Sequence, residues 1–452
     1  MTIDFEPRLT RNWTDPNAVG LDGYVAAGGY AGLRQALGMA DTDIVEQVKA
    51  SGLRGRGGAG FPTGMKWGFV PRDTGKPTYV VVNFDESEPG TCNNRELVER
   101  EPHRLLEGTA IAALAIGCET AYVYVRGEYL WQSIVLERAL AEAYAGGYLG
   151  ADVCGSSKRI DVVLHRGAGA YICGEETALL NSLEGLRGQP RLRPPFPAVE
   201  GLFASPTVIN NVETLMNVPD IITKGVEWFR AVGTEKSPGS KLLTISGKVE
   251  RPGNYEIPLG TPFSVVLEEL AGGMLEGRSL KAWTPGGSST PLLTAAHADT
   301  GLDYESLAAA GSMLGTAAIM VLDETDCVVD CAQRMVAFYA HESCGKCTPC
   351  REGTWWVTRT LGRIEDGYGR EQDIPLVGEV GQNILFKAFC ALADGAVSPI
   401  ASTLQYFRDE YEAHVREGRC PVTGVGPGAH AEPPAAVTFT TTGPFDVLGV
   451  GS

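Results

Sequence analysis

The stretch "TYVVVNFDESEPG", residues 78–90, holds the two features that decide the fold and point to a site. Its first half, "TYVVVNF", is apolar and β-branched, which is typical of a buried strand. Its second half places Asn83, Asp85, Glu86 and Glu88 just past the end of that strand. Open α/β sheets bind ligands at the carboxyl ends of their strands. The stretch therefore predicts a core strand that leads directly into a ligand site.

Helix and strand patterns alternate on both sides of this strand. Upstream, residues 41–51 predict a short helix that Asp41 caps. Downstream, the sequence predicts a small-residue helix, a strand, an amphipathic helix, a strand and a further helix, at residues 108–117, 121–127, 131–144, 160–166 and 174–185. Such alternation is the pattern of a mostly parallel sheet covered by helices. We expect an α/β domain over residues 1–239.

The pattern changes after "LRPPFPA" (192–198). Residues 240–325 contain short strands and one helix, which predicts a small α+β domain of the β-grasp (ubiquitin-like) type. From Asp326 to residue 420 the chain reads as helical. Residues 421–452 are rich in Pro, Gly and Thr and are expected to form a flexible tail.

One helix in the third region carries a clear apolar face. In "SPIASTLQYFRDEYEAHV" (398–415), Ser398 is expected to cap the helix and Pro399 to occupy its first position. Apolar side chains then recur at helical spacing, at Ile400, Leu404, Phe407, Tyr411 and Val415.

Composition excludes several classes of function. The 452-residue chain has a formal net charge of -17, which disfavours binding to nucleic acid or to anionic lipid. It has no apolar run long enough for a membrane span, and its N-terminus lacks an apolar signal core. We therefore expect no membrane insertion and a cytoplasmic location. In that compartment the eleven cysteines are expected to be reduced, so a cysteine cluster indicates metal or redox chemistry.

Three cysteines, Cys344, Cys347 and Cys350, fall on one short loop in "HESCGKCTPCREG" (341–353). Their dense spacing favours an iron–sulfur cluster over zinc, which more often uses separated pairs or histidines. Cys390 is the candidate for a fourth thiolate. A redox dithiol and unliganded thiols are less favoured alternatives. Cys327 and Cys331 are predicted to pack on one helix face, and the remaining cysteines, including Cys420, have no partner at metal spacing.

A glycine loop, "GLRGRGGAGFPTGMKW" (52–67), matches G-x-G-x-x-G at Gly55, Gly57 and Gly60. A helix precedes it and a strand follows, so it does not fit the ordinary dinucleotide fingerprint. Its glycines and interleaved cations (Arg54, Arg56) still favour a phosphate-bearing cofactor over a plain turn. A second glycine loop, "GAGAYICGEET" (167–177), repeats the theme of a strand followed by glycines and acids. The alternative for its glutamates is compensation of a helix dipole.

Six motifs together resemble the flavin- and NADH-binding subunit of respiratory complex I. They are "GRGGAGFPTGMKW", "NFDESEPGT", "GAGAYICGEETALLNSLEG", "RPPFPA", "PTVINNVETL" and "ESCGKCTPCREG", and the resemblance spans residues 20–420. It implies a flavin-binding α/β domain, a β-grasp domain and a helical bundle with a 4Fe–4S cluster. It further implies hydride transfer from NADH to FMN and single-electron transfer through the cluster to partner subunits and quinone.

The resemblance also implies roles for residues that match its motifs. It places Cys344, Cys347, Cys350 and Cys390 on the cluster, and Glu88 and Glu176, the candidate catalytic residues, at the nicotinamide and its ribose. Phe61, Phe69 and Phe196 would surround the adenine. The FMN and the remaining cofactor contacts would involve Gly55, Arg56, Gly57, Gly58, Lys66, Asn83, Asp85, Gly174, Glu175, Asn210, Asn211 and Thr214.

The chain departs from the family pattern at two places. Arg193 stands where a lysine is usual, and arginine is not equivalent to lysine at a tight contact. Asn93 and Asn94 stand where Lys-Asp is usual.

The expected partners are the complex I peripheral-arm subunits, namely a 2Fe–2S thioredoxin-like subunit and a large iron–sulfur subunit, on the cytoplasmic face of the membrane. Two alternatives remain. One is the diaphorase subunit of a soluble NAD-linked hydrogenase or formate dehydrogenase. The other is a non-enzymatic scaffold that binds zinc through Cys344–Cys390.

Overall fold

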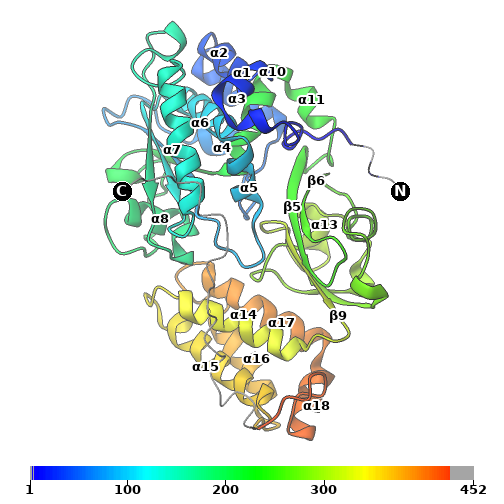
Figure 1. The fold of residues 1–452 in the computed structure, drawn as a ribbon. Coiled ribbons are helices and arrows are strands. Elements are labelled where there is room, and N and C mark those ends of the chain that lie inside the picture. The colour runs from blue at the N-terminus through cyan, green and yellow to red at the C-terminus, as the bar shows by residue number, and fades with distance from the viewer. Residues whose placement is uncertain (1–2, 4, 428–452) are drawn as a thin grey trace, which may run out of the picture.

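The computed structural model, shown in Figure 1, describes residues 3 and 5–427. Its first sheet has four strands in the order β3-β2-β1-β4. All three strand pairs are parallel. The strands are β1 (Tyr79–Phe84), β2 (Thr120–Val125), β3 (Asp161–Arg166) and β4 (Thr207–Asn211). The predicted parallel sheet is confirmed, and β4 is a strand that the sequence pattern did not predict.

Helices cover both faces of this sheet. Successive side chains of a strand point to opposite faces, and accordingly Val80 and Val82 of β1 lie in one apolar core while Val81 lies in another. The first core is closed by helices of the N-terminal half, the second by α8 and by helices near the C-terminus. The helices of this region are α1 (Leu21–Ala26), α2 (Ala31–Leu37), α3 (Asp41–Ser51), α4 (Thr63–Gly68), α5 (Asn93–Arg100), α6 (Pro102–Ile116), α7 (Leu130–Ala145), α8 (Glu176–Leu183), α9 (Val212–Met216), α10 (Val218–Lys224) and α11 (Val226–Arg230).

The predicted helix at residues 41–51 is confirmed, but its predicted cap is wrong. Ala40 occupies the cap position and Asp41 is the first helical residue. The carboxylate of Asp41 instead accepts a hydrogen bond from Arg72 at 3.2 Å. Its charge still lies in the first turn, where it favours the helix dipole.

The second sheet is mixed and has five strands in the order β6-β5-β9-β7-β8. β5 (Ser240–Gly247) pairs antiparallel with β6 (Gly253–Pro258) and parallel with β9 (Ala318–Asp323), which is the central strand. β7 (Leu280–Thr284) and the short β8 (Leu293–Thr294) complete the sheet. The predicted helix corresponds to α12 (Phe263–Val265) and a π-helical turn to Leu270, and α13 (Tyr304–Ala309) is an additional short helix. This arrangement agrees with the predicted β-grasp type.

The third region is helical, as predicted. Figure 1 shows α14 (Val328–Glu342), α15 (Thr348–Glu365), α16 (Asp373–Ile384) and α17 (Leu392–Tyr406) lying side by side below the first sheet. The last helix is α18 (Arg408–Glu417).

The predicted helix at 398–415 is wrong in its limits. Residues 398 and 399 lie inside α17, so Ser398 is not a cap and Pro399 is not a first-turn residue. Pro399 is buried within the bundle, and tertiary packing outweighs the hydrogen bond that its missing N–H removes. The backbone of Phe407, with ψ 32°, is not helical and separates α17 from α18. The five apolar residues therefore do not share one helix face.

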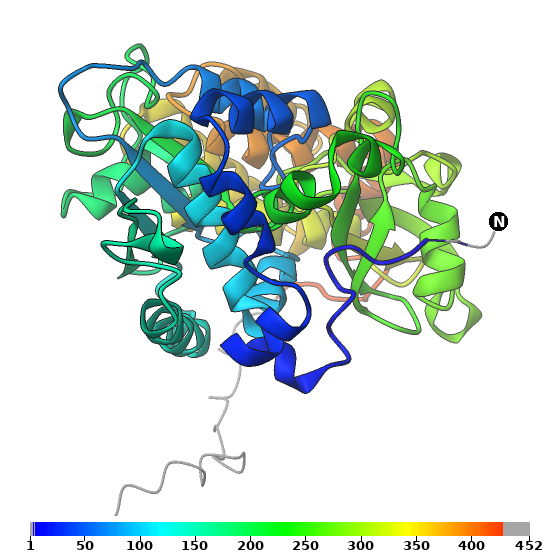
Figure 2. The ribbon, with the colours of Figure 1, turned by 90° about the horizontal axis from the view of Figure 1, so that it is seen from above.

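An N-terminal segment, residues 5–13, joins the first two regions. Figure 2 shows it running from the second sheet to the helices of the first region. The carboxylate of Glu256 on β6 accepts hydrogen bonds of 2.9–3.1 Å from the backbone N–H groups of Arg8, Leu9 and Thr10. The guanidinium of Arg8 donates to the carbonyl oxygen of Phe229 at 3.0 Å.

Within residues 3 and 5–427, no helix combines the length and the hydropathy that crossing a bilayer requires. Most of the predicted tail, from residue 428 onward, lies outside the described residues.

Candidate functional site

A cavity of about 700 Å³ opens where the carboxyl ends of the parallel strands meet the other two regions. The pairing of Asn83 with Asn211 and of Phe84 with Val125 aligns these strand ends, so the loops that follow them converge. Nine of the predicted site residues line the cavity, namely Arg56, Gly57, Gly58, Asn83, Asp85, Glu88, Gly174, Glu175 and Asn211. The sequence prediction of a site at this sheet edge agrees with the geometry.

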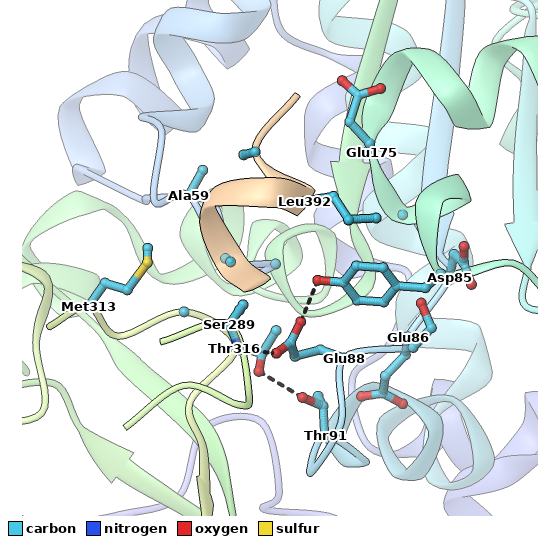
Figure 3. A pocket seen from close by; sticks show the side chains of 18 of the residues that line it. Ala59, Asp85, Glu86, Glu88, Thr91, Glu175, Ser289, Met313, Thr316 and Leu392 are labelled. Carbon is cyan, nitrogen blue, oxygen red and sulfur yellow. Dashed lines mark hydrogen bonds between the residues drawn. The ribbon is translucent and has the colours of Figure 1, made fainter. Parts of the chain in front are cut away.

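Asp85 lies on the cavity wall (Figure 3), and its two carboxyl oxygens are shielded from solvent. Neither of its carboxyl oxygens has a hydrogen-bond partner among the described residues. Burial raises its pKa to about 8, and the opposing charge of Arg126 offsets only part of this. An unpaired buried carboxyl is costly unless a ligand group satisfies it, so Asp85 fits the wall of a polar cofactor site.

Glu88 lies at the junction of all three regions. Its carboxylate accepts hydrogen bonds from the hydroxyl of Tyr171 at 2.6 Å and from the backbone N–H of Ser289 at 2.7 Å. The hydroxyls of Ser288 and Tyr339 add contacts at 3.1 and 3.3 Å. Figure 3 shows the carboxylate of Glu88 close to Ser289 and Thr316. Four donors fix the position and the acceptor character of this carboxylate.

Glu86 has a structural role that the sequence left open. Its carboxylate accepts from the backbone N–H groups of Asn94 and Arg95 at 2.6 and 2.9 Å, and from the hydroxyl of Tyr129 at 2.9 Å. Burial raises its pKa, and these three hydrogen bonds act against that rise. Glu86 therefore anchors the start of α5 beside the cavity.

Asn93 and Asn94, which form one of the two departures from the family pattern, also line the cavity. The Asn93 amide donates to the carbonyl oxygens of Leu242 and Thr316, at 2.9 and 3.2 Å. In this chain the first asparagine thus ties the acidic loop to the second sheet.

The glycine loop lies between α3 and α4 and presents its backbone to the cavity. Gly58 has a φ of 145°, which strongly favours glycine. A Cβ on Gly57 would lie 2.8 Å from the Cβ of Asn211, so this loop approaches β4 more closely than a side chain allows. The backbone N–H of Arg56 donates to the hydroxyl of Thr214 at 2.8 Å and holds the loop in place. Such a cradle suits a phosphate-bearing cofactor.

Eight predicted residues do not line the cavity itself, namely Gly55, Phe61, Lys66, Phe69, Glu176, Phe196, Asn210 and Thr214. Thr214 supports the glycine loop, and Asn210 accepts a hydrogen bond from the indole of Trp67 at 2.8 Å.

Ion pairs gather the remaining residues of this group into an outer cluster. Lys66 donates to Glu176 at 2.7 Å, and Arg193 donates to the other oxygen of Glu176 at 3.0 Å. Burial acts to raise the pKa of Glu176, but the charges of Lys66 and Arg193 outweigh it and lower the pKa. Phe69, at the end of α4, lies three residues after Lys66, and Phe196 lies three residues after Arg193. The ion pairs therefore hold together two segments that expose aromatic rings. Phe61 and Phe69 lie with ring centroids 6.2 Å apart.

The four predicted cysteine ligands converge. Cys344, Cys347, Cys350 and Cys390 line one small cavity between the start of α15 and the start of α17. Lys346 lies beside them, with its ammonium 4.0 Å from the ring centroid of Phe389 and 2.6 Å from the carbonyl oxygen of Pro190. Four thiols with an adjacent cation fit an anionic iron–sulfur cluster. Ile172 and Leu392 line both this cavity and the larger one, so the two sites share a wall.

Sequence reasoning missed the cavity residues that come from distant parts of the chain. They are Ser289, Pro291, Ser312, Met313, Thr316 and several residues between 385 and 398. No local pattern marks them, because they reach the cavity only through the packing of the three regions.

Models of known protein families match parts of all three regions. Residues 48–220 match the model of the Nuo51 FMN-binding domain, and residues 330–414 match the NADH-ubiquinone oxidoreductase-F iron-sulfur binding region. Residues 242–293 match the SLBB domain. The cofactors are thus FMN and a 4Fe–4S cluster.

Two relatives show how far the similarity extends. The F subunit of the NADH-quinone oxidoreductase of Streptomyces coelicolor is 56% identical over 415 residues, covering 92% of this chain and 92% of the relative. The corresponding protein of Mycobacterium tuberculosis is also 56% identical, covering 92% of this chain and 95% of the relative.

A solved structure shares the fold. The crystal structure of an NAD+-reducing [NiFe]-hydrogenase in the H2-reduced state aligns with a TM-score of 0.80 and 35% sequence identity. The alignment covers 91% of this chain and 67% of the hydrogenase chain.

The matches to the FMN-binding and iron–sulfur models contradict the zinc scaffold alternative. Together with the near full-length relatives, they show that the chain belongs to the family of NADH-quinone oxidoreductase F subunits, the flavin- and iron–sulfur-containing proteins through which electrons from NADH enter complex I.

Proposed function

We propose that FMN and the nicotinamide of NADH meet in the 700 Å³ cavity. The cluster that accepts electrons from the flavin is held by Cys344, Cys347, Cys350 and Cys390. The observation that carries this proposal is the shared wall of Ile172 and Leu392 between the two sites. Two redox cofactors bound on opposite sides of that wall are separated from each other by little more than two side chains.

FMN supplies the conversion between a two-electron donor and a one-electron acceptor, which no side chain can provide. The residues of this chain bind and orient. The loop from Gly55 to Gly58, with Lys66 nearby, takes the phosphate-bearing end of the flavin. Asn83, Asp85, Asn211, Asn210 and Thr214 surround the remainder, and Gly174 and Glu175 border the same space.

Glu88 faces the nicotinamide in this proposal, since its carboxylate lies on the cavity wall and is held by four donors. No general acid or base is required for hydride transfer. The outer cluster then receives the other half of the dinucleotide. Glu176 contacts a ribose, and the exposed rings of Phe61, Phe69 and Phe196 surround the adenine.

We further propose that the chain divides into domains at residues 1–239, 240–325 and 326–420, with a tail at 421–452. The boundaries fall between α11 and β5, between β9 and α14, and just past α18. Each of the first three stretches carries its own sheet or helical bundle.

The proposed partners are the 2Fe–2S thioredoxin-like subunit and the large iron–sulfur subunit of complex I, on the cytoplasmic face of the membrane. The names of the relatives support this assignment. Trp355 and Trp356 on α15 are about half exposed, at 53% and 55%, and this helix begins within the cysteine loop. Exposed aromatic side chains are enriched at protein interfaces, so this face suits the partner that receives the electrons.

The test is an anaerobic visible spectrum of the natively purified complex before and after one equivalent of NADH. We expect flavin absorbance near roughly 450 nm to bleach, with NADPH as the control that leaves it unchanged. Cys390→Ser is expected to lower the iron content and to leave the flavin in place. A coloured complex that NADH does not bleach would remove NADH as the donor.

The diaphorase alternative has one observation in its favour, the structural match to the NAD+-reducing hydrogenase. The relatives at 56% identity favour the complex I assignment over it. Co-purification of this chain with membrane subunits would support complex I, and co-purification with a soluble hydrogenase would support the alternative.

A further inference from the structure

A second group of metal-binding side chains lies in the helical region, apart from the cysteines assigned to the cluster. Cys327, Glu365, His414 and Cys420 are all buried, and one ligand atom from each lies within 4.8 Å of every other. Cys327 precedes α14, Glu365 ends α15, His414 lies on α18, and Cys420 follows α18. Residues nearly one hundred positions apart therefore converge on a single point.

The two cysteine groups lie at opposite ends of the same two helices. α14 starts at the Cys327 group and ends just before Cys344, and α15 starts in the Cys344 loop and ends at Glu365. The shorter helix, α14, has 15 residues. At about 1.5 Å per residue the groups are therefore on the order of 20 Å apart. The second group is not part of the iron–sulfur site.

Three of the distances within the group are close to those of tetrahedral coordination. Cys327 Sγ lies 3.2 Å from Glu365 Oε2 and 3.4 Å from His414 Nε2, and those last two atoms are 3.0 Å apart. Zinc holds sulfur at about 2.3 Å and nitrogen or oxygen at about 2.0–2.1 Å, so tetrahedral geometry places such ligands roughly 3.3–3.6 Å from one another. The three separations need to open by only a few tenths of an ångström.

The histidine is oriented as a ligand. Its Nδ1 contacts the carbonyl oxygen of Glu410 at 2.7 Å. A carbonyl only accepts, so Nδ1 carries the proton and Nε2 can present its lone pair to the group. A backbone carbonyl on the far nitrogen is the usual support for a metal-bound histidine.

Both sulfurs accept a hydrogen bond from the backbone. The backbone N–H of Asp330 donates to Cys327 at 3.3 Å, and the backbone N–H of Thr423 donates to Cys420 at 3.4 Å. Each N–H comes from the third residue after its cysteine. Cys327 also caps the N-terminus of α14, where the helix dipole stabilises negative charge.

We propose that Cys327, Glu365, His414 and Cys420 bind a structural zinc ion. Two sulfurs, one imidazole nitrogen and one carboxylate oxygen complete a four-coordinate shell with no position left for substrate, which is typical of structural zinc. The ion fastens α18 and the chain that follows it to the far ends of α14 and α15. A metal-free ion pair between His414 and Glu365, with two thiols beside it, is the competing arrangement.

The test uses the full chain purified natively with its partners. Metal analysis is paired with X-ray absorption at the zinc edge. We expect zinc with a first shell of two sulfurs and two nitrogen or oxygen atoms, besides the iron of the clusters. A shell of four sulfurs would overturn the proposal, because it would place the zinc on the cluster cysteines. If no zinc with this shell is found, the proposal is equally overturned, and the metal-free ion pair between His414 and Glu365 is the arrangement that remains.

Variants locate the ion. Cys420→Ser and Glu365→Gln are each expected to remove about one zinc per chain and to leave iron and flavin content unchanged. Cys331→Ser is the matched control, since Cys331 lies one turn further along α14 and is not in the group. Zinc that survives in both variants, or that Cys331→Ser removes as well, contradicts the assignment. The absorption spectrum of the unaltered protein decides the question even if a variant does not fold.

Discussion

Asp85 is an acid that the fold keeps from ionising. Its pKa of about 8 exceeds the value of 3.8 that an exposed aspartate has. Between these two pH values the unfolded chain releases a proton that the folded chain retains, so the folded state loses stability as the pH rises.

The flavin-depleted protein should therefore become easier to unfold between pH 5 and pH 8, by up to about 1.4 kcal/mol per pH unit. In Asp85→Asn this dependence should be absent, since the amide does not titrate. Urea unfolding at several pH values measures both slopes. Asp22→Asn, at an exposed position on α1, serves as the control and should keep the slope of the unaltered protein. Equal slopes in Asp85→Asn and the unaltered protein would assign the effect to another group.

At the scale of single elements, a substitution in the glycine loop tests whether this loop binds the cofactor. Gly57→Ala would place a methyl group 2.8 Å from the Cβ of Asn211 and force the loop away from β4. Overpacking of this kind costs about 1–3 kcal/mol, so FMN should bind roughly tenfold more weakly, or worse.

Fluorescence titration of the flavin-depleted variant with FMN measures this loss. Gly68→Ala on α4 is the matched control, because its Cβ would meet only a methyl group of Val45 at 4.0 Å. Unchanged FMN affinity in Gly57→Ala would mean that the loop does not contact the cofactor.

A buried ion pair joins β5 to α9. The ammonium of Lys241 donates to Glu213, and both side chains are almost fully buried, at 1% and 0% exposure. Lys241→Met leaves the Glu213 charge without its partner, which should destabilise the protein by about 3–5 kcal/mol.

Chemical denaturation measures this cost. Lys49→Met, which removes an exposed pair with Glu46, should cost less than about 1 kcal/mol. The double variant Lys241→Met/Glu213→Gln should recover part of the loss, because no buried charge remains. A cost of the same size in both single variants would show that burial of the Lys241 pair is unimportant.

The elements also show what local sequence can predict. β1, β2 and β3 follow from apolar β-branched runs, and the acidic site residues after β1 and β3 follow from the rule that ligands bind at strand ends. α17 could not be bounded, because Pro399 is tolerated only through packing against other helices. Ser289 and Thr316 reach the cavity, and Cys327 reaches Cys420, through contacts between distant segments. The spacing of residues along the sequence does not reveal such contacts.

At the scale of the whole molecule, one carboxylate secures the N-terminal segment. Glu256→Ala removes the acceptor of the N–H groups of Arg8, Leu9 and Thr10. We expect those amides to exchange with solvent deuterium much faster in the variant, while FMN content stays unchanged, because Glu256 does not line the cavity. Hydrogen exchange with mass spectrometry checks this, with the exposed Glu250→Ala as control. If the amides of residues 8–10 stay equally protected from exchange, the contact of the Arg8 guanidinium with Phe229 is sufficient to hold the segment.

The same segment constrains how the protein is made. Arg8 leaves the ribosome among the first residues, yet its acceptors on Phe229 and Glu256 lie 221 and 248 positions later. Translation proceeds at about 5–20 residues per second, so the segment waits roughly 10–50 seconds for its docking surface. During that interval the nascent N-terminus is open to chaperones and proteases. Its final docking is a late step, which requires that β6 of the second sheet has been synthesised.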